Sequence, residues 1–203
     1  MPRSISFDEH ETLRAIGQLF WRNGYTATAM DQICEHVSLT KPSIYNTYGD
    51  KATLFRKVVD WYADEMGEQG VAVLKGKAPV SEEVAGLLRH FLVRPASDFV
   101  SQGCLLTSSM MELQFSEPEL FDYVVKRIDR VRDAIETYLS TARKDGLLKS
   151  DCDPSALSEY VFTVFQGLRM QSRTSAGRIN LERTISTAMG PLRDAEPMIN
   201  HGH

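Results

Sequence analysis

Cysteine is scarce in this sequence of 203 residues, and its three copies form no pair. Cys34, Cys104 and Cys152 lie far apart and include no C-x-x-C motif. This spacing argues against a disulfide framework and against a zinc site, and it fits a reducing cytoplasm. Because Cys104 has neither a resolving cysteine nor an evident basic neighbour in the sequence, we interpret it as a buried, inert thiol.

Long hydrophobic runs are also missing. The longest uncharged stretch near the middle, FVSQGCLLTSSMM at 99–111, is too short and too rich in hydroxyl groups to cross a bilayer. The first residues, MPRSISFDEHE, lack the apolar segment of a secretory signal. We therefore expect a cytoplasmic protein with no membrane segment.

The sequence contains no glycine-rich phosphate loop, nucleophile elbow or HExxH motif. Its five histidines are dispersed without the spacing of metal ligands, and its acidic residues are scattered along expected helix faces. These absences predict a protein that is not an enzyme and that has no metal site and no cofactor.

Charge of neither sign dominates, since 23 Lys and Arg stand against 27 Asp and Glu. The distribution is uneven, however: residues 38–57 contain four Lys or Arg and a single Asp. An acidic protein with a locally basic segment can bind DNA, but a basic patch this small does not identify a DNA-binding protein by itself.

Apolar residues recur at intervals of three and four along most of the chain, and no segment alternates as a strand would. The pattern predicts an all-α protein. The expected helices begin near Asp8, Thr28, Thr40, Asp50, residue 81, Cys104, Pro118, Asp153 and residue 180.

The second and third helices are joined by only a few residues around 37–39, which is typical of a helix-turn-helix whose second helix enters the DNA major groove. Thr40 is suited to cap that helix, and Ile44 and Tyr48 are expected to face inward because they are four residues apart. The residues expected to face outward carry donors and acceptors that suit phosphates and base edges: Lys41, Ser43, Tyr45, Asn46 and Thr47. The alternative is a solvated polar face on a small helical bundle.

The stretch GYTATAMDQICEHVSLTKPSIYNTYGDKATLF at 24–55 resembles the DNA-binding region of the tetracycline-repressor (TetR/AcrR) family of bacterial regulators. The shared features are Gly-Tyr after the first helix, Thr at the start of the second, Ile-Tyr in the third and the Gly-Asp-Lys turn. GCLLTSSMMEL at 103–113 and FQGLRMQSRTSAG at 165–177 resemble recurrent stretches of the family's ligand domains.

The resemblance implies phosphate contacts by Thr28, Thr40, Tyr45 and Lys51. It places Lys41, Pro42, Ser43 and Asn46 nearest the bases. The sequence departs from the family at Ala29, where many members have a phosphate-binding Ser, and at Cys34, which replaces a common Ala. At Ser38 many members have Gly, so the turn must form without the freedom of glycine at positive φ.

The resemblance also implies a domain order: a three-helix helix-turn-helix domain at 1–50, a larger helical ligand-binding and dimerisation domain at 51–195, and a loose tail at 196–203. Dimers of the family form through the last two long helices, here about 153–175 and 180–192. The candidate surface, which could instead be an intramolecular core, comprises Leu157, Tyr160, Val161, Val164, Gly167, Leu168, Leu181, Ile185 and Met189. Glycine inside a helix at 167 suggests a close backbone approach.

The resemblance implies that helices four to eight enclose an inducer pocket, and the candidate residues suit an uncharged or aromatic ligand. They are Trp61, Tyr62, Met66, Phe91, Met110, Met111, Phe115, Phe162, Phe165 and Gln166, each of which could instead belong to the core. The resulting hypothesis is a homodimeric repressor that a small molecule releases from a palindromic operator. The alternatives are a ligand-independent DNA-binding protein and a helical interaction scaffold.

Overall fold

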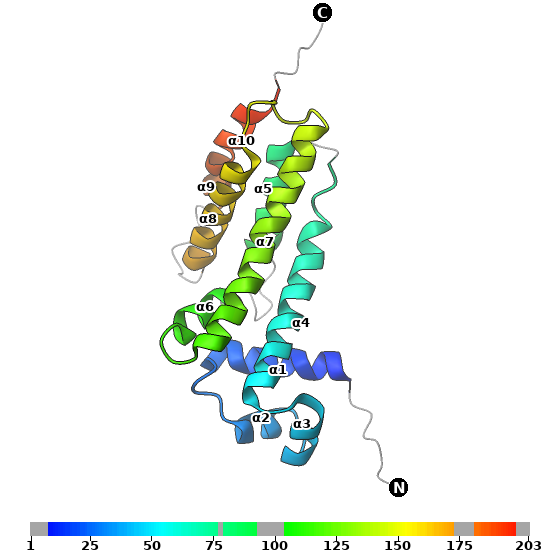
Figure 1. The fold of residues 1–203 in the computed structure, drawn as a ribbon, viewed down its shortest axis with the longest axis vertical. Helices are drawn as coiled ribbons and strands as arrows, with labels where there is room; N and C mark the ends of the chain where they lie inside the picture. Colours follow the sequence, from blue (N-terminus) through cyan, green and yellow to red (C-terminus); the bar gives the residue numbers. More distant parts are fainter. Residues whose placement is uncertain (1–7, 77–78, 93–103, 173–180, 198–203) are drawn as a thin grey trace, which may run out of the picture. The chain divides into compact units, whose positions relative to one another are not determined.

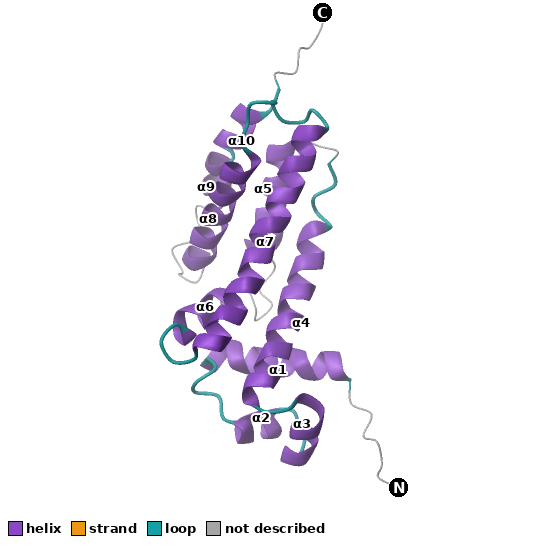
Figure 2. Ribbon diagram, in the orientation of Figure 1, coloured by secondary structure: helices purple, strands orange, loops and turns teal. Residues whose placement is uncertain are grey.

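The computed structural model describes residues 8–76, 79–92, 104–172 and 181–197, apart from the side chains of residues 66, 68, 69, 71 and 172. These ranges contain ten α-helices and no strand, so the predicted all-α class is confirmed (Figures 1 and 2). The helices are α1 (Glu9–Asn23), α2 (Met30–His36), α3 (Lys41–Tyr48), α4 (Lys51–Val71), α5 (Val80–Leu92), α6 (Leu105–Leu113), α7 (Pro118–Lys144), α8 (Pro154–Ser172), α9 (Leu181–Ala188) and α10 (Gly190–Ala195). None of the helices in the described ranges combines the length and apolar character of a bilayer span.

The chain divides into two compact units. The first comprises Met1–Met66 and Cys104–Ile128, and the second comprises Gly67–Gly103 and Asp129–His203. The first unit therefore contains α1, α2, α3 and α6 together with the first parts of α4 and α7. The two units are defined by packing within the chain. The predicted domain boundaries at residues 50 and 195 separate regions by function, and they stay a prediction.

The core of the first unit is built from aromatic and aliphatic side chains of α1 to α4. Phe55 of α4 is fully buried, with its ring centroid 5.2 Å from that of Phe20 and 4.9 Å from that of Tyr25. Burying a phenylalanine in this way contributes about 1.5–3 kcal/mol to stability. A Cβ at Gly17 would lie 3.2 Å from Cζ3 of Trp61, so the missing side chain lets α1 and α4 approach closely.

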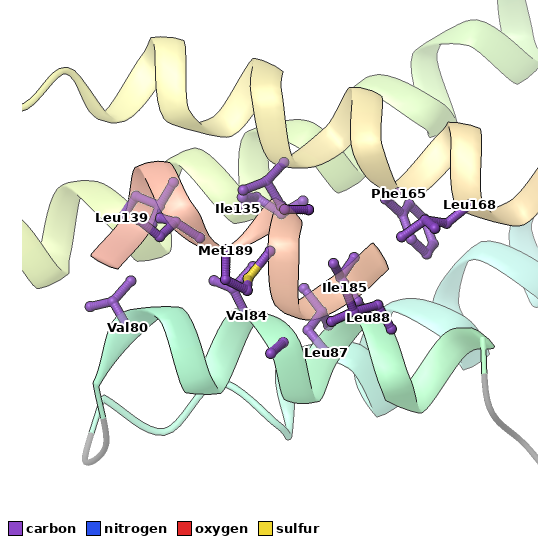
Figure 3. Packing of buried hydrophobic residues seen from close by; sticks show 14 of the residues in the cluster. Val80, Val84, Leu87, Leu88, Ile135, Leu139, Phe165, Leu168, Ile185 and Met189 are labelled. Atoms are coloured by element: carbon purple, nitrogen blue, oxygen red, sulfur yellow. The ribbon is translucent and has the colours of Figure 1, made fainter. Parts of the chain in front are cut away.

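The core of the second unit is formed by α5, α7, α8 and α9 (Figure 3). Along α5, the buried Val80, Val84 and Leu88 follow one another at intervals of four and form an apolar stripe. Figure 3 shows this stripe facing Leu139, Phe165 and Ile185 of the other three helices and Met189, which lies between α9 and α10.

Four residues predicted for a dimer surface lie in this core instead. Val161, Leu168, Ile185 and Met189 are buried within the second unit, so the prediction is wrong for them: their partners belong to the same chain. Leu157, Tyr160, Val164 and Leu181 are half-buried, and Gly167 is exposed. The last predicted helix is also divided, because α9 ends at Ala188 and Gly190-Pro191 starts α10.

A buried carboxylate joins three segments of the second unit. Glu83 Oε2 accepts hydrogen bonds from the backbone N–H groups of Lys75 (2.7 Å) and Gly76 (2.8 Å) and from the Tyr138 hydroxyl (2.9 Å). Burial, followed by the hydrogen bond to Glu83, raises the pKa of Tyr138. The carboxylate thus satisfies backbone donors that would otherwise lack a partner in the turn after α4, and it ties that turn to α5 and α7.

Candidate nucleic-acid interface

The turn between α2 and α3 is a Schellman motif formed without glycine. Leu39 N–H donates to Cys34 O (3.0 Å) and Ser38 N–H donates to Glu35 O (3.2 Å), which is the paired pattern of that motif. Ser38 adopts the left-handed conformation that the motif requires, with φ of 55°. The expected departure from glycine at this position therefore leaves the geometry of the turn intact, at a cost of conformational strain.

We predict that Ser38→Gly stabilises the protein. A non-glycine residue in the left-handed region costs roughly 1–2 kcal/mol, and the greater freedom of glycine in the unfolded chain offsets part of the gain, so the free energy of unfolding should rise by about 0.5–1 kcal/mol. Urea denaturation followed by circular dichroism measures the change. Ser155→Gly, in the first turn of α8, is the matched control and should destabilise the protein. A loss of stability in Ser38→Gly would contradict the strain argument.

Helix α3 presents a polar face on a buried apolar anchor. The Thr40 hydroxyl accepts a hydrogen bond from Ser43 N–H (3.4 Å), as expected for an N-cap. Ile44 and Tyr48 are both buried, which confirms that they face inward. On the other side, Tyr45 is 47% exposed. Lys41, Pro42, Asn46 and Thr47 are also exposed, and Ser43 is half-buried.

An ion pair links α2 to the start of α3. Lys41 Nζ lies 2.5 Å from Asp31 Oδ1, and the hydrogen bond that the ammonium donates to Asp31 is the main cause that raises the pKa of Lys41. Both side chains are exposed, so the pair contributes little to stability. Its main effect is to hold the Lys41 ammonium on the α2 side of the polar face. Asp31 was not among the predicted site residues, and the local sequence pattern does not indicate this contact between helices.

Lys51 lies at the start of α4 and contacts the loop that joins α1 to α2. Its ammonium donates to Thr26 O (3.4 Å) and stands 4.4 Å from the centroid of the Tyr25 ring. Burial lowers the pKa of Lys51. The side chain is only half-buried, so it remains accessible from outside while the loop fixes its position.

Thr28 is not part of the exposed face. Its side chain is 0% exposed and its hydroxyl donates to Gly24 O (2.6 Å), so the predicted phosphate contact by this side chain is wrong for the structure. The start of α2 was also misplaced by one residue. Ala29 is the N-cap, and its N–H donates to the Gln32 side chain (2.8 Å), whereas the helix was expected to begin near Thr28.

A carboxylate far away in the sequence also reaches this region. Glu112 of α6 accepts hydrogen bonds from Tyr25 N–H (2.9 Å) and Thr26 N–H (2.7 Å). Glu112 was not among the predicted site residues. Because the contact joins segments more than 80 residues apart, helical periodicity contains no information about it.

The candidate ligand residues of the first unit have different surroundings. Trp61 packs on Gly17, and its ring stands edge-on to His10 at 5.8 Å. Tyr62 is buried, and its hydroxyl donates to Cys104 Sγ (3.8 Å). The Cys104 thiol, which was expected to be buried, is half-buried. Met110 is half-buried, whereas Met111 is 60% and Phe115 is 90% exposed, and the side chain of Met66 lies outside the described part.

The remaining ligand candidates belong to the second unit. The rings of Phe91 and Phe165 are 5.5 Å apart, and Phe91 and Phe162 both pack against the core of that unit. Gln166 is half-buried on the same helix as Phe162 and Phe165. The structure therefore brings the three phenylalanines together around one core, while their role toward a ligand stays a prediction.

Two models of known protein families match the chain. Residues 13–58, which include α2, the Schellman turn and α3, match the model described as bacterial regulatory proteins of the tetR family. Residues 81–188 match the C-terminal domain described as tetracyclin repressor-like, and this match alone spans more than half of the chain. The chain belongs to the TetR family. The predicted family and the predicted combination of a helix-turn-helix domain with a larger helical domain are thus confirmed.

Relatives of known name agree with this assignment. The chain is 25% identical to the HTH-type transcriptional repressor ComR of Escherichia coli strain K12 over 92% of this chain and 88% of ComR. It is 28% identical to the TetR family regulator CifR in a complex with 26-bp operator DNA, over 95% of this chain and 98% of CifR, with a TM-score of 0.78. A TetR family regulator from Cytophaga hutchinsonii shares the fold at 15% identity, with a TM-score of 0.81 over 94% of this chain and 98% of that one. This TetR family member is a DNA-binding transcriptional regulator, and the matched family is described as one of bacterial regulatory proteins.

Proposed function

We propose that this TetR family regulator is a homodimeric repressor that binds a palindromic operator through α3 and leaves it when a small molecule binds the C-terminal part. The observation that carries the proposal is the exposed polar face of α3, held by the buried Ile44 and Tyr48 and by the turn at Ser38. A recognition helix needs this combination of a fixed backbone and free side chains.

The proposed contacts divide into two groups. Thr40, Tyr45 and Lys51 bind phosphates and thereby fix the position of the protein on the duplex. The side chains that approach base edges are Lys41, Pro42, Ser43 and Asn46. For Lys41 this contact competes with the ion pair to Asp31, so the ammonium exchanges one anionic partner for another when DNA binds. Thr28 is left out because its side chain is buried.

Dimerisation through α8 is proposed because a single α3 reads too few base pairs for a specific site. One face of α8 carries Ala156, Thr163, Gly167 and Met170 at helical spacing, and all four residues are exposed. Met170 is a large apolar side chain that is 48% exposed, and a Cβ at Gly167 would meet no described atom within 4 Å. This face is small and partly apolar, so it suits close packing against a second copy of the same helix.

The repressor assignment follows the relatives, since ComR is named a repressor and CifR is bound to an operator. The ligand assignment draws support from the aromatic side chains of the second unit, where Phe91, Phe162 and Phe165 offer apolar contacts and the buried guanidinium of Arg169 stands 5.4 Å from the centroid of the Phe165 ring. An uncharged or aromatic ligand fits these side chains best. The competing function is a regulator that binds DNA without a ligand.

Selection of bound sequences from random duplex DNA tests the proposal. The full-length protein should enrich a palindrome whose half-sites are separated by one helical turn, about 34 Å, or by a multiple of it. The selected operator is then titrated with a library of hydrophobic compounds, and a true ligand should both raise the melting temperature of the protein and release the DNA. Enrichment of an asymmetric site would contradict the dimer, and a library with neither stabiliser nor releasing compound would favour the ligand-independent regulator.

A further inference from the structure

We propose that Glu112 of α6 is a positioning residue for DNA binding: its carboxylate holds the loop between α1 and α2, and through that loop it fixes the ammonium of Lys51. The inference rests on the proposed contact between Lys51 and a phosphate.

The Glu112 carboxylate uses both of its oxygens on the loop. Oε2 accepts from Tyr25 N–H at 2.9 Å and Oε1 accepts from Thr26 N–H at 2.7 Å. Two consecutive amides that point at two oxygens of one carboxylate form a fork that fixes both the position and the direction of the peptide. The loop that contains these amides follows α1, and Glu112 belongs to α6. Helices α1 and α6 pack against each other in the first unit.

Gly24 makes room for the carboxylate. It ends α1 with φ of 84°, and its N–H donates to Phe20 O (2.8 Å). A Cβ at this position would lie 2.7 Å from Glu112 Oε2, closer than side-chain carbons approach other atoms. The Gly-Tyr pair at the end of α1 therefore serves two needs, the left-handed cap of the helix and the access of Glu112 to the next two amides.

Lys51 binds the same residue, Thr26, through its carbonyl group. Its Nζ donates to Thr26 O (3.4 Å), so the N–H of Thr26 is bonded to Glu112 while its C=O is bonded to Lys51. The ammonium also rests 4.4 Å from the centroid of the Tyr25 ring, and the N–H of Tyr25 is the second group that Glu112 binds. Both contacts of Lys51 are thus to residues that Glu112 fixes, and release of the loop would leave the ammonium without a defined place.

Simple electrostatics predicts the opposite effect for Glu112. Removing a negative charge near a DNA-binding surface raises DNA affinity if the charge acts only through repulsion. A positioning role predicts a fall in affinity, since Gln in place of Glu would direct an NH2 group at one of the two backbone N–H donors and lose that hydrogen bond. The direction of the change therefore separates the two roles.

Glu117 supplies a matched control. It is exposed, it lies close enough to Lys51 to interact with its charge, and the contacts of the loop do not involve it. Glu117→Gln removes the same charge as Glu112→Gln but leaves the fork in place, so it should leave affinity unchanged or raise it slightly.

The experiment compares the full-length wild type with E112Q, E117Q, K51A and the double variant E112Q/K51A on the operator at several salt concentrations. We expect E112Q to weaken operator binding 5- to 30-fold. The plot of the logarithm of the binding constant against the logarithm of the salt concentration should become less steep by roughly 2 (the salt slope), since each protomer of a dimer loses about one phosphate contact. In the K51A variant, adding E112Q should weaken operator binding little further. Thermal unfolding verifies that each variant is folded, and E112D, which retains the charge on a shorter side chain, replaces E112Q if that variant does not fold.

Three results would overturn the inference: a folded E112Q that binds like E117Q, a loss of affinity without a change in salt slope, or an equal loss in the K51A background. The proposed phosphate contact is tested separately by K51A alone. If K51A binds as the wild type does, that contact is wrong, and the inference about Glu112 falls with it for a reason distinct from the three above.

Discussion

Replacing Tyr45 and Asn46 with alanine is expected to lower operator affinity by a factor of roughly 1,000 or more, because contacts of this kind contribute about 1–3 kcal/mol each and a dimer makes every contact twice. Both side chains are exposed on α3, so their removal leaves the core around Ile44 and Tyr48 intact. Fluorescence anisotropy with a labelled operator measures the change in affinity.

The control for this pair is Lys144→Ala, an exposed substitution near the end of α7 that should leave affinity unchanged. Circular dichroism should show the same helix content in all variants. If the double variant of α3 retains wild-type affinity while it is folded, α3 is not the recognition helix.

Gly167→Arg is expected to convert the proposed dimer into a monomer at micromolar concentration and to weaken operator binding by about 100-fold or more, since one recognition helix reads only a half-site. The physical reason lies outside the single chain. A Cβ at Gly167 meets no described atom within 4 Å, and replacing glycine inside a helix favours the helix by several tenths of a kcal/mol up to about 1 kcal/mol. An isolated chain should therefore tolerate the arginine well, and only a second chain packed against α8 gives it an unfavourable contact.

Sedimentation equilibrium distinguishes the two states. Ala134→Arg places the same side chain on an exposed position of α7 and should remain dimeric. A Gly167→Arg variant that is still a dimer would show that the dimer interface excludes this face of α8.

Local signals in the sequence predicted the recognition region well. The capping hydroxyl of Thr40 and the spacing of Ile44 and Tyr48 are properties of consecutive residues, and each has the predicted position in α3. Asp153 likewise caps α8 through the N–H groups of Ser155 and Ala156, as its place before Pro154 indicates.

Contacts between distant segments were beyond sequence reasoning. Periodicity shows that a helix has an apolar face, but it does not show what covers that face. For this reason Val161 and Ile185 were predicted for a dimer surface although they pack within their own chain. The position of Lys51 depends on a loop that is held by Glu112 of α6, so it does not follow from the local sequence pattern.

The close packing of Trp61 on Gly17 gives the regulator a natural optical reporter. The sequence contains two tryptophans, Trp21 and Trp61, and both lie in the first unit, so the second unit emits no indole fluorescence. Trp21 stands edge-on to Tyr62 at 5.3 Å, and Trp61 borders His10 at the start of α1. A change in emission wavelength or quenching during a titration therefore originates in the half of the molecule that contains α3, and it can be followed without attaching a dye.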